Sequence, residues 1–101
     1  MEVSPIINSL STEDVVAVEI FTRESPPCNF CIYAKRWIAK YLPEASVHEY
    51  NINRDSDKWS IFLSVHPAAR TIPQITLTMK NGKVVYVGGY DKLEASFSAS
   101  V

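Results

Sequence analysis

The sequence predicts an α/β domain with elements in the order strand, helix, strand, helix, strand, strand, helix, and with four strands in one mixed sheet flanked by helices. An apolar, β-branched run at Val15–Thr22 precedes an amphipathic stretch that opens at Cys28. A second strand and helix follow, and two short β-rich runs then flank Asn81-Gly82. A strand–helix–strand unit implies a parallel pair of strands, whereas a hairpin implies an antiparallel pair.

Length and composition limit the organisation of the chain. It has 101 residues, of which 47% are hydrophobic, which is enough for one core and leaves no room for a second domain. We therefore expect residues 15–101 to form a single domain. Residues 1–14 contain serines, a proline and a Ser-Thr-Glu-Asp run, so they are interpreted as a lead-in without an assigned helix or strand.

Charge and hydropathy exclude several classes of partner. Ten Lys and Arg residues stand against eleven Asp and Glu residues, and the net charge is −1 without a basic run that could follow a phosphate backbone. No apolar stretch reaches the roughly 20 residues that span a bilayer, and the first ten residues do not resemble a signal peptide. We expect a cytoplasmic monomer that binds neither nucleic acid nor membrane.

The first strand and helix are the clearest elements. Val15–Thr22 is mostly apolar and β-branched, which predicts a central strand covered on both faces. The next segment contains Pro26 and Pro27, which cannot donate ladder hydrogen bonds. From Cys28 to about Leu42 apolar residues recur every three or four positions, which predicts an amphipathic helix that ends before Pro43.

The second strand and helix are shorter. Ser46–Ile52 alternates between two sets of side chains, as a strand does. Asp57 to about His66 has its aromatic and aliphatic residues at helical intervals and is followed by Pro67, so a helix is predicted there.

The last third of the chain predicts a hairpin and a terminal helix. Ile75–Met79 and Val84–Gly88 are β-rich and are separated by Asn81-Gly82, a strong hairpin signal. Asp91 stands three residues before Glu94, so we predict that Asp91 is the N-cap of a short terminal helix.

The two cysteines carry the predicted chemistry. They form Cys28-Asn29-Phe30-Cys31 at the start of the first helix, where free N–H groups and the helix dipole favour a thiolate. Cys28 is expected at the exposed N-terminal position and is predicted to attack a substrate disulfide. Cys31, about one turn later on the same face, would displace the substrate and close an intramolecular disulfide. Lys35 is a candidate for lowering a thiol pKa.

A structural interpretation of the cysteines stands beside the redox one. They could be ordinary half-buried cysteines or half of a zinc site. The chain has no other cysteine, and His48 and His66 are distant in sequence, so no metal site is expected.

Four segments resemble the glutaredoxin family of the thioredoxin superfamily. They are Phe21-Thr22-Arg23, Cys28-Asn29-Phe30-Cys31, Thr71-Ile72-Pro73-Gln74-Ile75 and Gly88-Gly89-Tyr90-Asp91. The likeness covers about residues 15–99 and is to small dithiol glutaredoxins of bacteria and tailed phages. It implies a thioredoxin-like fold and a glutathione-dependent oxidoreductase that reduces protein disulfides and glutathione mixed disulfides. It also makes ribonucleotide reductase a candidate partner, and the host cytoplasm the location if the protein is phage-encoded.

The resemblance also implies a glutathione site. Thr71, Ile72 and Pro73 would form one wall, with a cis Ile72-Pro73 peptide facing Cys28 and the Ile72 backbone pairing with an extended peptide. Gly89, Tyr90 and Asp91 would hold the γ-glutamyl end of glutathione, with N–H donors for its carboxylate and Asp91 for its ammonium group. The structural alternatives are a proline at a strand edge, a turn made by the glycine pair, and an N-cap.

Two basic residues are candidates for the glycyl carboxylate of glutathione, and the sequence departs from the family near each end of the site. Arg70 and Arg23 are the candidates, although either could be a solvated surface charge. Arg23 stands five positions before Cys28 instead of the three that are usual in the family. Lys92 occupies a position where many members carry an acid.

Two further functions use the same cysteines. The protein could be a redoxin that a flavoenzyme of the thioredoxin-reductase type reduces directly. It could instead be a non-enzymatic binding module or iron–sulfur cluster carrier, with Cys28 as a ligand. The sequence separates neither of these from a glutathione-dependent enzyme.

Overall fold

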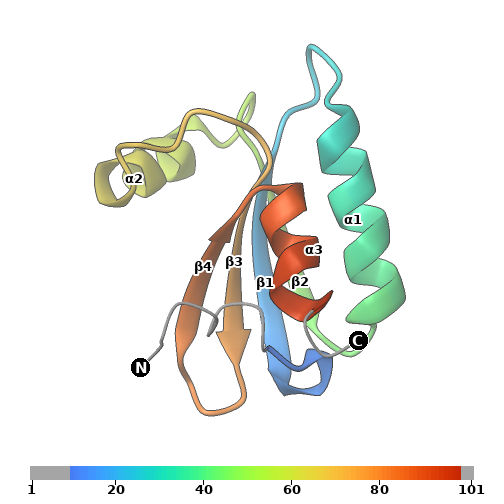
Figure 1. Ribbon diagram of the computed structural model, residues 1–101. Coiled ribbons are helices and arrows are strands. Elements are labelled where there is room, and N and C mark those ends of the chain that lie inside the picture. Colours follow the sequence, from blue (N-terminus) through green and yellow to red (C-terminus); the bar gives the residue numbers. More distant parts are fainter. Residues whose placement is uncertain (1–9, 99–101) are drawn as a thin grey trace.

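The computed structural model describes residues 10–98, and its elements follow the predicted order (Figure 1). A single 3-10 turn at Thr12–Asp14 precedes the first strand. The elements are β1 (Val15–Thr22), α1 (Asn29–Tyr41), β2 (Ser46–Asn51), α2 (Ser56–Val65), β3 (Gln74–Met79), β4 (Val84–Gly88) and α3 (Tyr90–Ser98). Residues 1–9 of the predicted lead-in and residues 99–101 of the predicted domain lie outside the described residues.

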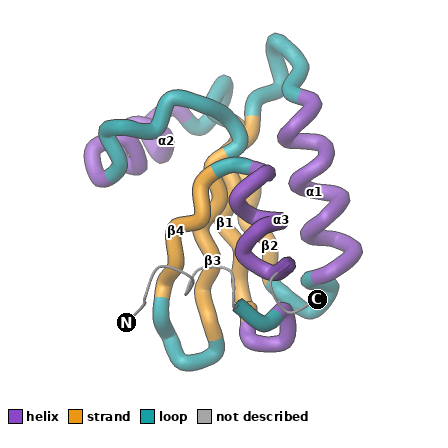
Figure 2. The backbone as a smooth tube through the Cα atoms, viewed as in Figure 1, coloured by secondary structure: helices purple, strands orange, loops and turns teal. Residues whose placement is uncertain are grey.

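The four strands form one mixed sheet in the order β2-β1-β3-β4. β1 runs parallel to β2 and antiparallel to β3, and β3 pairs with β4 in an antiparallel hairpin (Figure 2). Val18 of β1 lies opposite Val47 on one side and Leu77 on the other. The predicted central position of the first strand and the mixed character of the sheet are therefore confirmed.

Helices α1 and α3 cover one face of the sheet, and the hydrophobic core lies between them and the strands (Figure 1). None of the helices within residues 10–98 is long and apolar enough to cross a membrane. The core residues on this face come mainly from β1, α1, β3 and α3 and include Val18, Ile20, Ala34, Ile38, Ile75, Leu77, Leu93 and Phe97.

Among residues 10–98, the opposite face of the sheet is covered only near one end, so the expectation that β1 is buried on both faces was wrong for the described part of the chain. At that end the ring of Phe21 lies 5.3 Å from the ring of Trp59 and 4.9 Å from that of Phe62, both on α2. Further along β1, Val16 is 42% exposed and Glu19 is also exposed. The reason is that α2 has only ten residues and packs at the carboxyl end of the strand.

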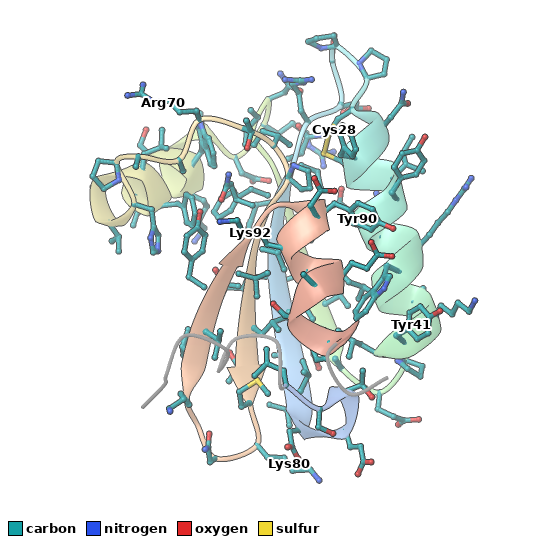
Figure 3. All side chains as sticks on the ribbon, in the orientation of Figure 1. Cys28, Tyr41, Arg70, Lys80, Tyr90 and Lys92 are labelled. Atoms are coloured by element: carbon teal, nitrogen blue, oxygen red, sulfur yellow. A yellow bond between two sulfur atoms is a disulfide. The ribbon has the colours of Figure 1, made fainter. Side chains whose placement is uncertain are left out.

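The hairpin between β3 and β4 forms as the Asn-Gly pair predicts. Gly82 has a φ of +88°, a conformation that a residue without a Cβ adopts readily. Its N–H donates to the carbonyl oxygen of Met79 at 2.9 Å, and the N–H of Lys83 donates to the side chain of Asn81 at 2.9 Å. This turn, marked by Lys80, lies at the end of the molecule opposite Cys28 (Figure 3).

The terminal helix begins at Tyr90, so the prediction that Asp91 is its N-cap was wrong. The carbonyl of Gly89 accepts the first helical hydrogen bond, from the N–H of Leu93 at 3.0 Å, and Asp91 lies in the first turn. Gly88, with a φ of +103°, turns the chain directly from β4 into α3. The helix therefore starts earlier than the position of the acid alone suggests.

Candidate active site

The two cysteines lie where the loop after β1 enters α1. Cys28 is the N-cap of the helix, in an extended conformation, and is joined to Cys31 by a disulfide. Its Sγ accepts a hydrogen bond from the backbone N–H of Cys31 at 3.2 Å, as a serine or aspartate would at this position. Once the disulfide is reduced, this N–H and the positive end of the helix favour a thiolate on Cys28.

Both sulfur-bearing side chains are nearly buried, so the expected exposure of Cys28 was wrong. Cys28 is 7% exposed and Cys31 is 4% exposed. The Sγ of Cys28 lies 3.7 Å from the carbonyl oxygen of Ile72, in the segment that leads into β3. This contact and the N-cap position distinguish Cys28 from Cys31, and exposure does not.

A cavity of about 560 Å³ lies beside this contact and brings most of the predicted binding residues together. We call it the groove. One wall comes from the segment before β3, and the other from the end of β4 and the start of α3. Its lining includes Arg70, Thr71, Ile72, Pro73, Gly89, Tyr90 and Asp91, as the resemblance implied.

The two walls of the groove pack against each other at the cis-proline segment. The Ile72-Pro73 peptide is cis, as expected from the resemblance. A Cβ on Gly89 would lie 3.7 Å from the carbonyl oxygen of Pro73, so the second wall packs against the first at this glycine. The chain also has a cis peptide at Ser25-Pro26, which the sequence analysis did not anticipate.

The two arginine candidates occupy different places. Arg70 belongs to the groove but is exposed, and its side chain extends away from Cys28 (Figure 3). Arg23 lies outside the groove, because its Nε donates to the carbonyl oxygen of Pro26 at 3.0 Å and so closes the turn before Cys28. The five-residue spacing between Arg23 and Cys28 accommodates this turn.

Residues that were not assigned to the site from the sequence also line the groove. They include Phe30, Gln74, Tyr86 and Lys92. Gln74 and Lys92 adjoin predicted residues in the sequence, so adjacency could have identified them. Phe30 lies within the Cys-x-x-Cys segment and could have been identified in the same way. Tyr86 reaches the groove only through the packing of β4, and no local pattern identifies it.

Both cysteines line a second cavity of about 360 Å³, whereas neither is among the residues that line the groove. The other side chains of the second cavity are mostly polar or charged. The loop that forms part of its wall is held by Asn53, whose Oδ1 accepts the N–H groups of Glu24 and Ser25, both at 3.1 Å. The side chain of Asn51 adds a hydrogen bond to Glu24 at 3.1 Å. The turn after β2 therefore positions the loop that carries Cys28.

Glu49 is the centre of a hydrogen-bond network in this second cavity. It accepts from the hydroxyl of Thr22 at 2.7 Å and from Nζ of Lys35 at 3.2 Å. Burial alone would raise the pKa of Glu49, but these hydrogen bonds and the charges of Lys35 and Arg54 outweigh burial and hold the pKa below its ordinary value. The charge of Lys35 is paired with Glu49, which weakens its predicted influence on the thiols.

The fold and these contacts define a class of protein. A mixed four-stranded sheet carries a Cys-x-x-Cys disulfide at a helix N-terminus, and a cis-proline segment lies against the first cysteine. This arrangement is that of a thioredoxin-fold thiol–disulfide oxidoreductase.

Comparison with known proteins narrows the class. No protein-family model and no curated protein sequence matches the chain. The solution structure of glutaredoxin from Brucella melitensis is similar, with a TM-score of 0.55 and 29% identity over 81% of this chain and 78% of that one. Glutaredoxin 1 from Francisella tularensis, with a TM-score of 0.52 and 22% identity over 78% of this chain and 88% of that one, shares the fold. The chain is a glutaredoxin-like thiol–disulfide oxidoreductase.

The Glu49 network predicts a pH-dependent contribution to stability. A carboxyl whose pKa is lowered on folding stabilises the protein above its unfolded pKa, near 4.5, and this contribution is lost as the pH falls through the folded pKa. Both partners are partly exposed, so Glu49→Gln should lower the free energy of unfolding at neutral pH by less than about 1 kcal/mol. In urea titrations the difference from wild type should shrink below pH 4.5.

The control is Glu44→Gln, which removes the same charge from an exposed position outside the network. A loss for Glu49→Gln that is the same at every pH, or that Glu44→Gln reproduces, would contradict this assignment.

Proposed function

We propose that the protein is a glutathione-dependent glutaredoxin that reduces protein disulfides and glutathione mixed disulfides, with Cys28 as the attacking thiol and Cys31 as the resolving thiol. The observation that carries the proposal is the contact of 3.7 Å between Sγ of Cys28 and the carbonyl oxygen of Ile72. It joins the first cysteine to the groove, which is large enough for a tripeptide.

The groove offers complementary groups to an extended peptide with the chemistry of glutathione. The backbone of Ile72 can pair with the peptide beside the sulfur of Cys28. The N-terminus of α3, at Tyr90 and Asp91, favours a carboxylate, and the carboxylate of Asp91 can accept from an ammonium group. Arg70 and Lys92 provide positive charge on the lining for the second carboxylate of glutathione.

The reaction with a glutathionylated protein follows from this placement. The Cys28 thiolate attacks the sulfur of the bound glutathionyl group, and the protein substrate leaves as a thiolate that takes a proton from water. A second glutathione thiolate then attacks the glutathione sulfur of the mixed disulfide. This step releases glutathione disulfide and restores the Cys28 thiolate, so Cys31 is not needed for this route.

The reaction with a protein disulfide requires both cysteines. Cys28 attacks one sulfur of the substrate disulfide and forms a mixed disulfide, and the first substrate thiol leaves. Cys31 then attacks Sγ of Cys28, which frees the second substrate thiol and leaves the Cys28–Cys31 disulfide. Two glutathione molecules would reduce this disulfide. A cytoplasmic location and ribonucleotide reductase as a protein substrate remain predictions from the sequence.

The roles of the cysteines predict different trapped species. Cys28→Ser should form no adduct with glutathione disulfide and should lose all exchange activity. Cys31→Ser should accumulate a glutathione adduct on Cys28 and retain part of its deglutathionylation activity. Intact-protein mass spectrometry and peptide mapping after alkylation measure both. Equal adducts on both variants, or equal partial losses of activity, would contradict the assigned roles.

An absorption spectrum of the purified protein and an assay with a flavoprotein reductase, added to the adduct measurement, separate the alternative functions. A cluster carrier would give an iron–sulfur absorption spectrum, and Cys28→Ser would keep partner function without thiol exchange. A redoxin served by a flavoenzyme would form little adduct with glutathione disulfide but would be reduced by that enzyme.

The charge on the second wall predicts a salt-sensitive contribution to substrate binding. Lys92→Gln should raise the KM for a glutathionylated peptide about threefold with little change in kcat, because an exposed charge contributes at most about 1 kcal/mol. The increase should diminish at high salt. Lys80→Gln makes the same change at the opposite end of the molecule and should leave the KM unchanged. An equal effect of the two substitutions on the KM would argue against substrate binding in the groove.

A further inference from the structure

Gln74 is the first residue of β3 and directly follows the cis-proline segment. It is only 4% exposed, although glutamine is long, polar and mostly found at the surface. A buried amide must satisfy its donors and its acceptor, since an unpaired one costs more than a hydrogen bond contributes. The partners of Gln74 therefore indicate why it is buried here.

Those partners lie on the two walls of the groove. The Nε2 group donates to the backbone carbonyl of Thr71 at 2.7 Å and lies 3.4 Å from the hydroxyl of the same residue. The Oε1 atom accepts a hydrogen bond from the hydroxyl of Tyr86 on β4. A carbonyl oxygen only accepts, so the contact with Thr71 fixes which end of the amide faces which partner.

Tyr86 is itself held in place. Its ring stacks on His66 with the centroids 4.1 Å apart, and Phe62 of α2 lies 5.8 Å away in an edge-on arrangement. Burial raises the pKa of the Tyr86 hydroxyl, so the group stays protonated and donates to Gln74 at working pH. The hydrogen bonds therefore connect β4 with the segment before Pro73, and the ring contacts extend this connection to the end of α2.

The segment that receives these hydrogen bonds has no regular structure between α2 and β3. Its Thr71 carbonyl directly precedes the Ile72 peptide, whose oxygen contacts Cys28. A free segment of this kind would lose conformational entropy when a peptide ordered it, whereas a fixed segment has already lost it.

We propose that Gln74, held by Tyr86, is a positioning residue that fixes the Thr71 carbonyl and so keeps the Ile72-Pro73 backbone in the orientation that receives the glutathione peptide. The proposal rests on the proposed function, because it concerns how the same groove binds its substrate. Gln74 would thus affect substrate binding through the Thr71 carbonyl, without a direct contact with the substrate.

The test measures binding of S-methylglutathione, which has no reactive thiol, to the reduced protein by calorimetry. Gln74→Leu keeps the approximate shape but removes both hydrogen bonds and should weaken binding about tenfold. Tyr86→Phe removes only the hydroxyl and should weaken it about threefold. In assays with a glutathionylated peptide, both should raise the KM by similar factors and leave kcat within about twofold.

A pH-dependent rescue separates positioning from a general loss of packing. Gln74→Glu would aim a carboxylate at the Thr71 carbonyl at about pH 8, and binding relative to wild type should be as weak as for Gln74→Leu. At about pH 5 a protonated carboxyl could donate to that carbonyl, so relative binding should recover. The control is Thr78→Val, a half-buried position on the same strand far from the groove, which should bind like wild type.

Two failures are distinguishable. If wild type does not bind S-methylglutathione, the proposed function fails. If wild type binds and Tyr86→Phe and the Gln74 variants bind equally well, or if Gln74→Glu shows no recovery at low pH, the positioning role is overturned. Tyr86→Phe keeps the test decisive if Gln74→Leu does not fold.

Discussion

The position of Cys28 at the N-cap of α1, against the carbonyl of Ile72, is the constraint on which the rest of the site depends. The helix supplies an N–H donor to the sulfur, and the segment before β3 supplies a backbone edge beside it. β1 lies between β2 and β3, so the end of β1 brings both the cysteine loop and the cis-proline segment to one end of the sheet. The chemistry of the cysteine pair and the proposed binding of a peptide therefore depend on the same junction.

Two cavities lie at this junction, one lined by Ile72 and the other by Cys28, and they differ in character. The groove has backbone edges, glycine and a helix N-terminus, which suit a peptide with carboxylate groups. The second cavity is polar, and the turn after β2 and the Glu49 network close it through side chains. We therefore propose that the groove recognises the substrate, whereas the contacts around the second cavity hold the loop that carries Cys28.

Most of the fold could be predicted from local sequence, because strands and helices have strong periods and the turns contain proline or glycine. The bounds of β1, the Asn81-Gly82 hairpin and the helix after Cys28 followed from such signals. The exposure of one face of β1 could not be predicted in this way, because a run of β-branched residues does not reveal how short the covering helix is. Asp91 was misassigned because Gly88 and Gly89 turn the chain before the acid is reached.

The candidate site could be predicted only in part from the sequence, because some of its residues lie in local motifs and others are brought there by tertiary contacts. The predicted glutathione-binding residues at 70–73 and 89–91 line the groove. Arg23 does not, because it closes its own turn. The burial of Cys28 and the roles of Gln74 and Tyr86 depend on contacts between distant strands, which no single-sequence pattern contains. The proposed positioning role of Gln74 depends on these tertiary contacts, which lie outside the local sequence motif around Pro73.

The most direct test of the central claim is the rate at which the wild-type protein reduces a glutathionylated peptide when glutathione, glutathione reductase and NADPH are supplied. Turnover should depend on glutathione and stop when glutathione is omitted. No turnover under these conditions, together with rapid reduction of the Cys28–Cys31 disulfide by a flavoprotein reductase alone, would contradict the proposed dependence on glutathione.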